Sequence, residues 1–267
     1  DGGRTFENTD VTSLIRVHGN SKGRQNGERI AVDPNSPNII YCGGRTGGLI
    51  KSTDYGETWS MVTDLGVMNT EVNWPSWTSN KVNTTKNSTG IVSVVFDVDS
   101  GKKGTASSRI FAAASVLDEA NIFVSEDSGK TFKPLSDDLP TNYYPQRMKM
   151  DSNGDLLIAY ADTTGDNGSS GTICRYDVSE KKVEEIGLPS GKPVGDVVCK
   201  SDDPNYLFAC TRGQWLPQKW STGNTVYGDN FYSSTDGGKT WKFLNIGAEA
   251  ALATGIAGML PECATAA

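Results

Sequence analysis

Histidine is almost absent from this chain, because His18 stands alone among 267 residues. The cysteines show no CxxC spacing, and their odd number weakens any disulfide framework; they are Cys42, Cys174, Cys199, Cys210 and Cys263. Zinc sites need closely spaced Cys and His, and a serine-hydrolase triad needs a histidine together with a G-x-S-x-G turn that is missing here. We therefore expect no metal and no cofactor. The apolar runs before Cys42 and Cys210 predict buried thiols on strands.

Basic residues are outnumbered: 25 Lys and Arg stand against 32 Asp and Glu, giving a formal charge of −7 and a pI near 4.8. Binding to a phosphate backbone needs clustered positive charge, so we expect no nucleic-acid partner. Long hydrophobic runs are also missing, since no window approaches the ~18 consecutive apolar residues of a membrane span. We therefore expect no membrane partner. No basic segment followed by an apolar stretch opens the chain, so we expect any signal peptide to have been removed or to lie outside this sequence.

The sequence also lacks a helical pattern, because no long stretch repeats apolar residues every 3.6 positions. Thirty Gly and eleven Pro, with many Ser, Thr, Asn and Asp, are typical of short strands joined by turns. A 267-residue chain with 36% hydrophobic content can bury an ordinary core. The composition predicts one all-β domain with little helix.

One short motif repeats along the chain. The pattern S-x-D-x-G-x-T-W runs from Ser52 to Trp59, returns at 125–132 and 234–241, and leaves its tail at 1–6. This is the Asp box, or BNR repeat. Its Asp accepts hydrogen bonds from its own turn, its Gly tolerates positive φ, and its aromatic residue is expected beneath the turn. We assign a structural role, without catalysis, to Asp1, Asp54, Trp59, Asp127, Phe132, Asp236 and Trp241.

The boxes belong to a longer unit in which two strands and a turn precede each box, as the similarity of 37–41 to 204–208 indicates. Such a unit is one blade of a β-propeller. We expect an Asp-box β-propeller of about four blades plus part of another, a portion of a seven-bladed ring. The blades are expected near 1–16, 28–64, 90–135, 146–188 and 194–245, the fourth without a box, and 246–267 as an irregular tail.

The turns of a four-stranded antiparallel blade alternate between two ends, so the long connections are expected to gather at the end opposite the boxes. Four of the six tryptophans fall in these connections, and exposed aromatic faces stack well on pyranose rings. We predict substrate-binding roles for Arg45, Trp74, Trp77, Tyr143, Tyr144, Gln146, Arg147, Trp215 and Trp220. The alternative is that some of these rings only cap the blade ends. Further polar candidates are Arg24, Asp162, Asp166, Arg212, Gln214 and Asp229.

Three N-x-S/T sequons, at Asn83, Asn87 and Asn167, fall at the same end. Glycans there would crowd a substrate groove. We therefore expect a host that does not glycosylate them, which indicates a secreted bacterial protein.

Two segments, 27–35 and 44–56, resemble the second and third blades of glycoside hydrolase family 74, the xyloglucanases. Looser similarity runs through 90–97, 154–160 and 171–176 to Trp215 and its neighbours. The resemblance implies two seven-bladed propellers facing each other across a cleft, with a second propeller C-terminal to this one. It also implies extracellular cleavage of the β-1,4-glucan backbone of xyloglucan.

The family inverts at the anomeric carbon with two aspartates, an acid and a base that must stand roughly 6.5–9.5 Å apart. By the resemblance, one aspartate lies upstream of anything matching Asp1 and the other in the second propeller. No residue of this chain matches either, so we expect a substrate-binding part without the catalytic pair. Arg45 and Trp215 match substrate-facing positions, and 143–147 falls in a cleft segment. The family's pattern usually has Trp at the position of Ser93 and His at the position of Gln146.

Two other functions remain open. A non-catalytic Asp-box propeller that binds glycan or protein would share every feature of the boxes. A sialidase would need an arginine triad and a Tyr nucleophile activated by Glu, and the F-R-I-P sequence that usually marks the first of those arginines is absent. The xyloglucanase interpretation therefore ranks first and the non-catalytic propeller second.

Overall fold

The computed structural model describes residues 3–11, 13–15, 27–44, 48–62, 90–164, 168–212, 214–216, 226–228 and 230–244. Almost all regular structure in them is β-strand, and the helices η1 (Val98–Ser100) and η2 (Pro189–Gly191) are single 3₁₀ turns. Nothing in these ranges forms a helix long and apolar enough to cross a membrane. The all-β class expected from composition is confirmed. Asp1 and the expected tail at 246–267 lie outside the described residues.

The chain divides into two compact units, which are described separately. The first unit holds one complete sheet and most of a second. Its complete sheet is β1 (Ile30–Val32), β2 (Ile40–Gly43), β3 (Leu49–Ser52) and β4 (Ser60–Met61). The sheet only partly in this unit is β5 (Ile91–Phe96), β6 (Ile110–Ala114), β7 (Ile122–Ser125) and β8 (Lys133–Pro134).

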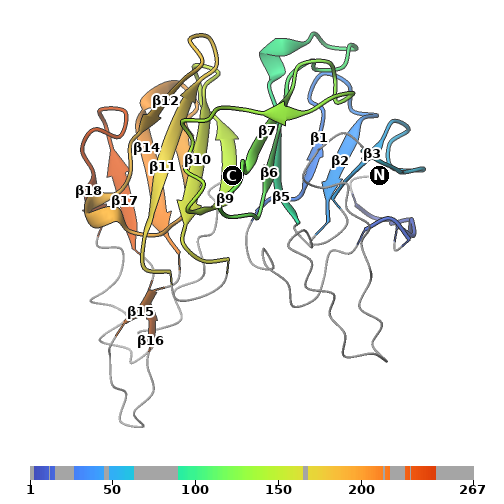
Figure 1. The fold of residues 1–267 in the computed structure, drawn as a ribbon. Coiled ribbons are helices and arrows are strands. Elements are labelled where there is room, and N and C mark those ends of the chain that lie inside the picture. Colours follow the sequence, from blue (N-terminus) through green and yellow to red (C-terminus); the bar gives the residue numbers. More distant parts are fainter. Residues whose placement is uncertain are drawn as a thin grey trace. The chain divides into compact units, whose positions relative to one another are not determined.

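The second unit holds two more sheets of the same kind (Figure 1). One is β9 (Tyr144–Met150), β10 (Leu156–Ala161), β11 (Gly171–Asp177) and β12 (Lys182–Glu185). The other is β13 (Val194–Lys200), β14 (Asp203–Thr211), β17 (Phe231–Ser234) and β18 (Lys242–Leu244). A hairpin of β15 (Gln214–Leu216) and β16 (Val226–Gly228) is inserted between β14 and β17. Four-stranded antiparallel sheets in chain order are the blades of a propeller.

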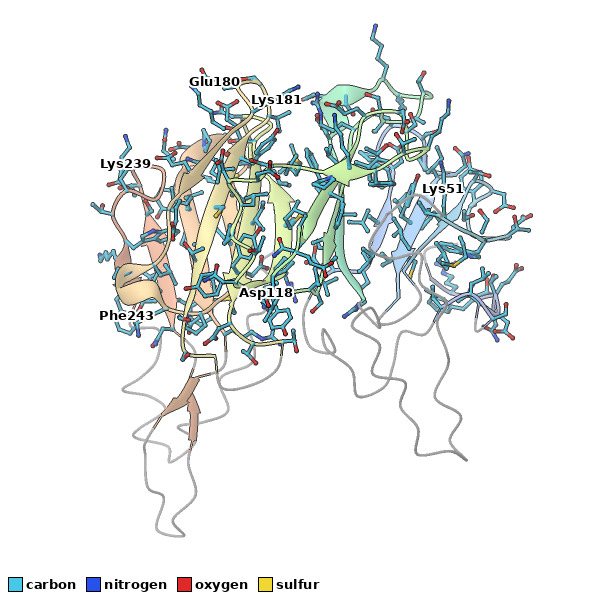
Figure 2. All side chains as sticks on the ribbon, in the orientation of Figure 1. Lys51, Asp118, Glu180, Lys181, Lys239 and Phe243 are labelled. Carbon is cyan, nitrogen blue, oxygen red and sulfur yellow. The ribbon has the colours of Figure 1, made fainter. Side chains whose placement is uncertain are left out.

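Strand order places each complete box at one end of its blade. Neighbours within each sheet follow one another in the chain, apart from the β15–β16 hairpin inserted between β14 and β17, so the first and third turns share an end and the second lies opposite. Figure 2 shows Glu180 and Lys181 in the β11–β12 turn at one end of the second unit and Asp118 at the other. The β15–β16 hairpin also extends from that second end (Figure 1). We call it the box-opposite end.

Pairing registers confirm the repeat inferred from the sequence. Ile40 stands opposite the box residue Ser52, and Leu207 stands opposite the box residue Ser234. Tyr41 and Phe208 are therefore equivalent. Tyr41 is fully buried, whereas Phe208 is 41% exposed.

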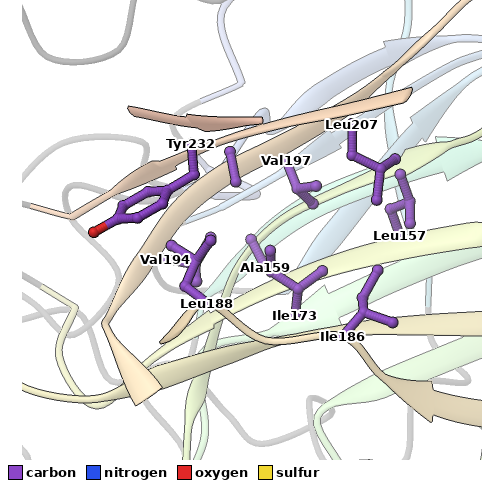
Figure 3. Packing of buried hydrophobic residues seen from close by; sticks show 10 residues of the cluster. Leu157, Ala159, Ile173, Ile186, Leu188, Val194, Val197, Leu207 and Tyr232 are labelled. Atoms are coloured by element: carbon purple, nitrogen blue, oxygen red, sulfur yellow. The ribbon is translucent and has the colours of Figure 1, made fainter. Parts of the chain in front are cut away.

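The core of the second unit lies between its two large sheets. Leu157, Ile173 and Leu207 form part of a buried apolar cluster with residues of β13 and the connection after β12 (Figure 3). These residues alternate along their strands with residues of the other face, as a strand that buries one face requires. Truncating one of them to alanine would cost about 2–5 kcal/mol.

Two expectations need correction. The blade expected to begin near 146 begins earlier, because β9 starts at Tyr144. Tyr144, Gln146 and Met148 are all buried, and the pairing of β9 with β10 shifts register at Gln146, so the strand continues through an irregularity that its sequence did not indicate. Cys210 is disulfide-bonded, not a free thiol, whereas Cys42, Cys174 and Cys199 are free.

Candidate functional site

The boxes form a closed hydrogen-bonded turn. In the first complete box, Ser52 Oγ donates to Asp54 Oδ1 at 2.8 Å and accepts from the Gly56 nitrogen at 2.8 Å. Asp54 also accepts from the Thr58 nitrogen at 2.9 Å and from the Thr58 hydroxyl. Trp59 Nε1 donates to the Gly56 carbonyl at 3.0 Å, which holds the indole against the turn. All these groups are partnered within the turn, as a structural role requires.

The other two complete boxes repeat this arrangement, with Asp127 and Asp236 accepting from the threonines four residues later. Hydrogen bonds from Thr58 lower the pKa of Asp54 to about 2, and those from Thr240 do the same for Asp236. Such carboxylates stay ionised at neutral pH, so they cannot supply a proton.

The boxes differ in what their aromatic residue contacts. Trp241 Nε1 donates to the carbonyl of Ile186 at 2.9 Å, and so ties the last box to the connection after β12. Phe132 is buried, whereas Phe6, in the partial copy at the start of the chain, is exposed. The β9–β12 blade has no box, and Asp177 there accepts from the nitrogens of Ser179 and Glu180 in a shorter turn.

The predicted substrate-binding residues and the further polar candidates fall into three groups. Those whose side chains can be placed are Tyr143, Tyr144, Gln146, Arg147, Asp162 and Arg212. The main chain of Trp215 and Gln214 lies in β15, on the hairpin at the box-opposite end. The others lie outside the described residues; they are Arg24, Arg45, Trp74, Trp77, Asp166, Trp220 and Asp229.

Tyr144 and Gln146 are buried at the start of β9, so neither side chain is an open platform for a sugar. Gln146 Nε2 donates to the Tyr144 carbonyl at 3.0 Å and to the Thr163 carbonyl at 2.9 Å. Its Oε1 is buried without a hydrogen-bond partner among the described residues. The Gln146 amide thus joins the start of β9 to the β10–β11 connection.

Two residues absent from the sequence-based set hold the segment before β9. Tyr160, fully buried on β10, donates from its hydroxyl to Asn121 Oδ1 at 3.3 Å. Asn121 Nδ2 in turn donates to the carbonyls of Pro140 and Tyr143, at 3.0 and 3.1 Å. The Asp118 nitrogen donates to Thr141 O at 2.9 Å in the same place. Asparagine at a strand start is too common for its sequence to reveal this.

Arg147 takes part in an ion pair between blades. Its Nη1 lies 3.3 Å from Asp196 Oδ2 on β13, and Lys149 Nζ lies 3.9 Å from the same oxygen. Asp196 is buried and also accepts from the Val197 nitrogen. A buried carboxylate between two cations is stable only while they remain, so Arg147 contributes to the seam between β9 and β13.

The β10–β11 connection is tied to its neighbour as well. Arg212, at the end of β14, donates from Nη2 to the Thr164 carbonyl at 3.3 Å and from its main-chain nitrogen to the Pro193 carbonyl at 3.0 Å. Asp162 accepts from the nitrogen and hydroxyl of Ser169. Asp162 and Asp196 are therefore engaged by protein groups, an arrangement typical of positioning and not of proton transfer. No cluster of metal ligands occurs among the described residues.

The chain matches known proteins by family model and by sequence. The model of the BNR/Asp-box repeat family matches residues 232–243, which contain the last box. A xyloglucanase of Hypocrea jecorina is 34% identical over 248 residues, or 90% of this chain, and xyloglucanase Xgh74A of Acetivibrio thermocellus is 31% identical over 91% of it. The chain spans 28% of the length of each of these relatives.

A solved structure agrees with the sequence matches. The GH74 enzyme of Niastella koreensis superposes with a TM-score of 0.73 and 33% identity, covering 91% of this chain and 33% of that protein. These matches identify the chain as a propeller portion of glycoside hydrolase family 74.

Proposed function

We propose that the protein containing this chain hydrolyses the β-1,4-glucan backbone of xyloglucan, and that this chain supplies substrate-binding surface. The observation that carries the proposal is the 34% identity to a xyloglucanase over 90% of the chain. The placement of the long connections at one end of the blades supports it, because that end is free of the self-contained boxes. Tyr143, Arg45 and the four loop tryptophans Trp74, Trp77, Trp215 and Trp220 are the proposed sugar contacts.

In the proposed mechanism this chain binds and orients the glucan, and the acid and base come from outside it. Inversion requires room for a water between two carboxylates roughly 6.5–9.5 Å apart. The box aspartates do not fit these roles, since their oxygens are filled by their own turns. We propose a second propeller as the partner that completes the cleft, and an extracellular site of action, where the polysaccharide occurs. A bacterial host remains a prediction.

A digest of tamarind xyloglucan tests the proposal. The full-length protein should release oligosaccharides detected by mass spectrometry, with an inverted anomeric product seen by proton NMR. The 267-residue chain alone should bind the polysaccharide without cleaving it. Cleavage by the chain alone would contradict the placement of the catalytic pair. Binding without cleavage by the full-length protein would favour the non-catalytic propeller.

A further inference from the structure

The segment at 140–146 is clamped on both sides by buried amides. Asn121 Nδ2 donates to the carbonyls of Pro140 and Tyr143, and Gln146 Nε2 donates to the carbonyl of Tyr144. Asn121 is 2% exposed and Gln146 is fully buried. Three main-chain carbonyls of this segment are thus satisfied by side chains, and two of them lie before β9 begins.

The clamp extends to the connections on either side. Asn121 belongs to the β6–β7 connection and is oriented by the Tyr160 hydroxyl. Gln146 reaches the carbonyl of Thr163 in the β10–β11 connection, and Arg212 reaches that of Thr164 beside it. Side chains therefore link four connections of the second unit at the box-opposite end, those after β6, β8, β10 and β14. Hydrogen bonds of this type fix a surface before ligand arrives, which lowers the entropic cost of binding.

We propose that Asn121 is a positioning residue of the carbohydrate-binding surface: it fixes the main chain on both sides of Tyr143 so that this residue is presented ready for substrate. This inference rests on the proposed function. Asn121 does not touch substrate, because its amide is filled by protein carbonyls and its Oδ1 by Tyr160. Its loss frees the segment to move, and binding must then order it again.

The test uses the full-length protein with Asn121→Ala. We expect KM for xyloglucan to rise roughly tenfold, the cost of re-ordering a few groups, with kcat within about twofold. Hydrogen exchange at the amides of 141–146 should quicken in the same variant, a readout that does not depend on activity. Unchanged exchange would overturn the clamp, and quicker exchange with unchanged KM would overturn its role in binding.

A matched control exists at the box end. Asn35 is also buried, and its Nδ2 donates to the Val98 carbonyl at 2.7 Å and to Ser107 Oγ at 3.0 Å. Asn35→Ala should lower the melting temperature by a similar amount while leaving KM unchanged. An equal rise in KM for both variants would mean that general destabilisation, not positioning, is responsible.

A second variant covers the case in which Asn121→Ala does not fold. Tyr160→Phe keeps the buried ring and removes only the hydroxyl that orients Asn121. It should raise KM by a smaller factor, roughly threefold, with the same increase in exchange at 141–146. No change in either quantity would overturn the inference. A wild-type protein that neither binds nor cleaves xyloglucan, yet shows the exchange effect, would refute the proposed function and leave the clamp intact.

Discussion

Lys51 on β3 donates from Nζ to the main-chain carbonyl of Ser128, in the turn of the next blade's box, at 3.1 Å. The corresponding contact recurs in the second unit, where Arg175 Nη1 on β11 donates to the carbonyl of Gly237 at 3.2 Å. Ser128 and Gly237 hold the same position in their boxes. A cation on the third strand of one blade therefore caps the box turn of the following blade.

Lys51→Met should lower the free energy of unfolding by about 1–2 kcal/mol, because a charge-assisted hydrogen bond to a carbonyl is lost. The Nζ also lies 5.2 Å from the centre of the Tyr41 ring, which adds to the loss. Lys51→Arg should retain most of the stability. Urea titration measures both, with Lys103→Met on an exposed residue as the control. Equal stability of the two methionine variants would refute the capping role.

Arg175→Met should be more costly, by about 3–5 kcal/mol, because it leaves a buried charge without its partner. The Arg175 Nε lies 3.3 Å from Asp151 Oδ2, and the Asp151 side chain is fully buried. Adding Asp151→Asn should restore part of the loss, since the carboxylate then no longer needs a counter-ion. Chemical denaturation of the two variants checks this, and a double variant no more stable than the single one would contradict it.

Gly129→Ala tests how tightly the second box packs on Tyr41. A Cβ at Gly129 would lie 1.8 Å from the Tyr41 hydroxyl oxygen, at a residue whose φ is +77°. We expect a loss of about 3 kcal/mol or more. Gly104 is the matched control, with φ of +88° and no atom within 4 Å of its Cβ, so Gly104→Ala should cost only about 1 kcal/mol. Thermal unfolding separates crowding from backbone strain, and similar losses would argue against crowding.

Acid should weaken the boxes over a defined pH range. The hydrogen bonds from Thr240 depress the folded-state pKa of Asp236 to about 2, below its ordinary value of 3.8. A depressed carboxylate pKa contributes stability that is present above the unfolded-state value and is lost as pH falls through the folded-state value. The contribution should therefore disappear between about pH 4 and pH 2.

Asp236→Asn should consequently flatten the pH dependence of the urea midpoint in that range. Asp99→Asn is the control, because Asp99 is an exposed carboxylate outside any box. Parallel curves for wild type and Asp236→Asn below about pH 4 would show that the box carboxylate does not drive acid unfolding.

The boxes could be predicted from sequence because each is a local structure: Ser52, Asp54 and Thr58 satisfy one another within seven residues. The blades followed from the repeat of this local signal and from strand-sized apolar runs. The clamp could not be predicted, since Asn121 contacts residues 19 to 39 positions away. Tyr144 and Gln146 were expected in a connection because a polar and an aromatic residue do not show the apolar pattern of a buried strand, yet both are buried.

The cation that caps a neighbouring box is missing from the sheet whose successor has no box. The residue before the box serine is Lys51 in the first sheet but Val124 in β7, and the blade that follows β5–β8 in the chain has no box. Among the described sheets, a cation on the third strand thus accompanies a box in the sheet that follows. Modules exchanged between propellers of this type ought to be chosen by that residue, since a lysine joined to a boxless successor would be left without its acceptor.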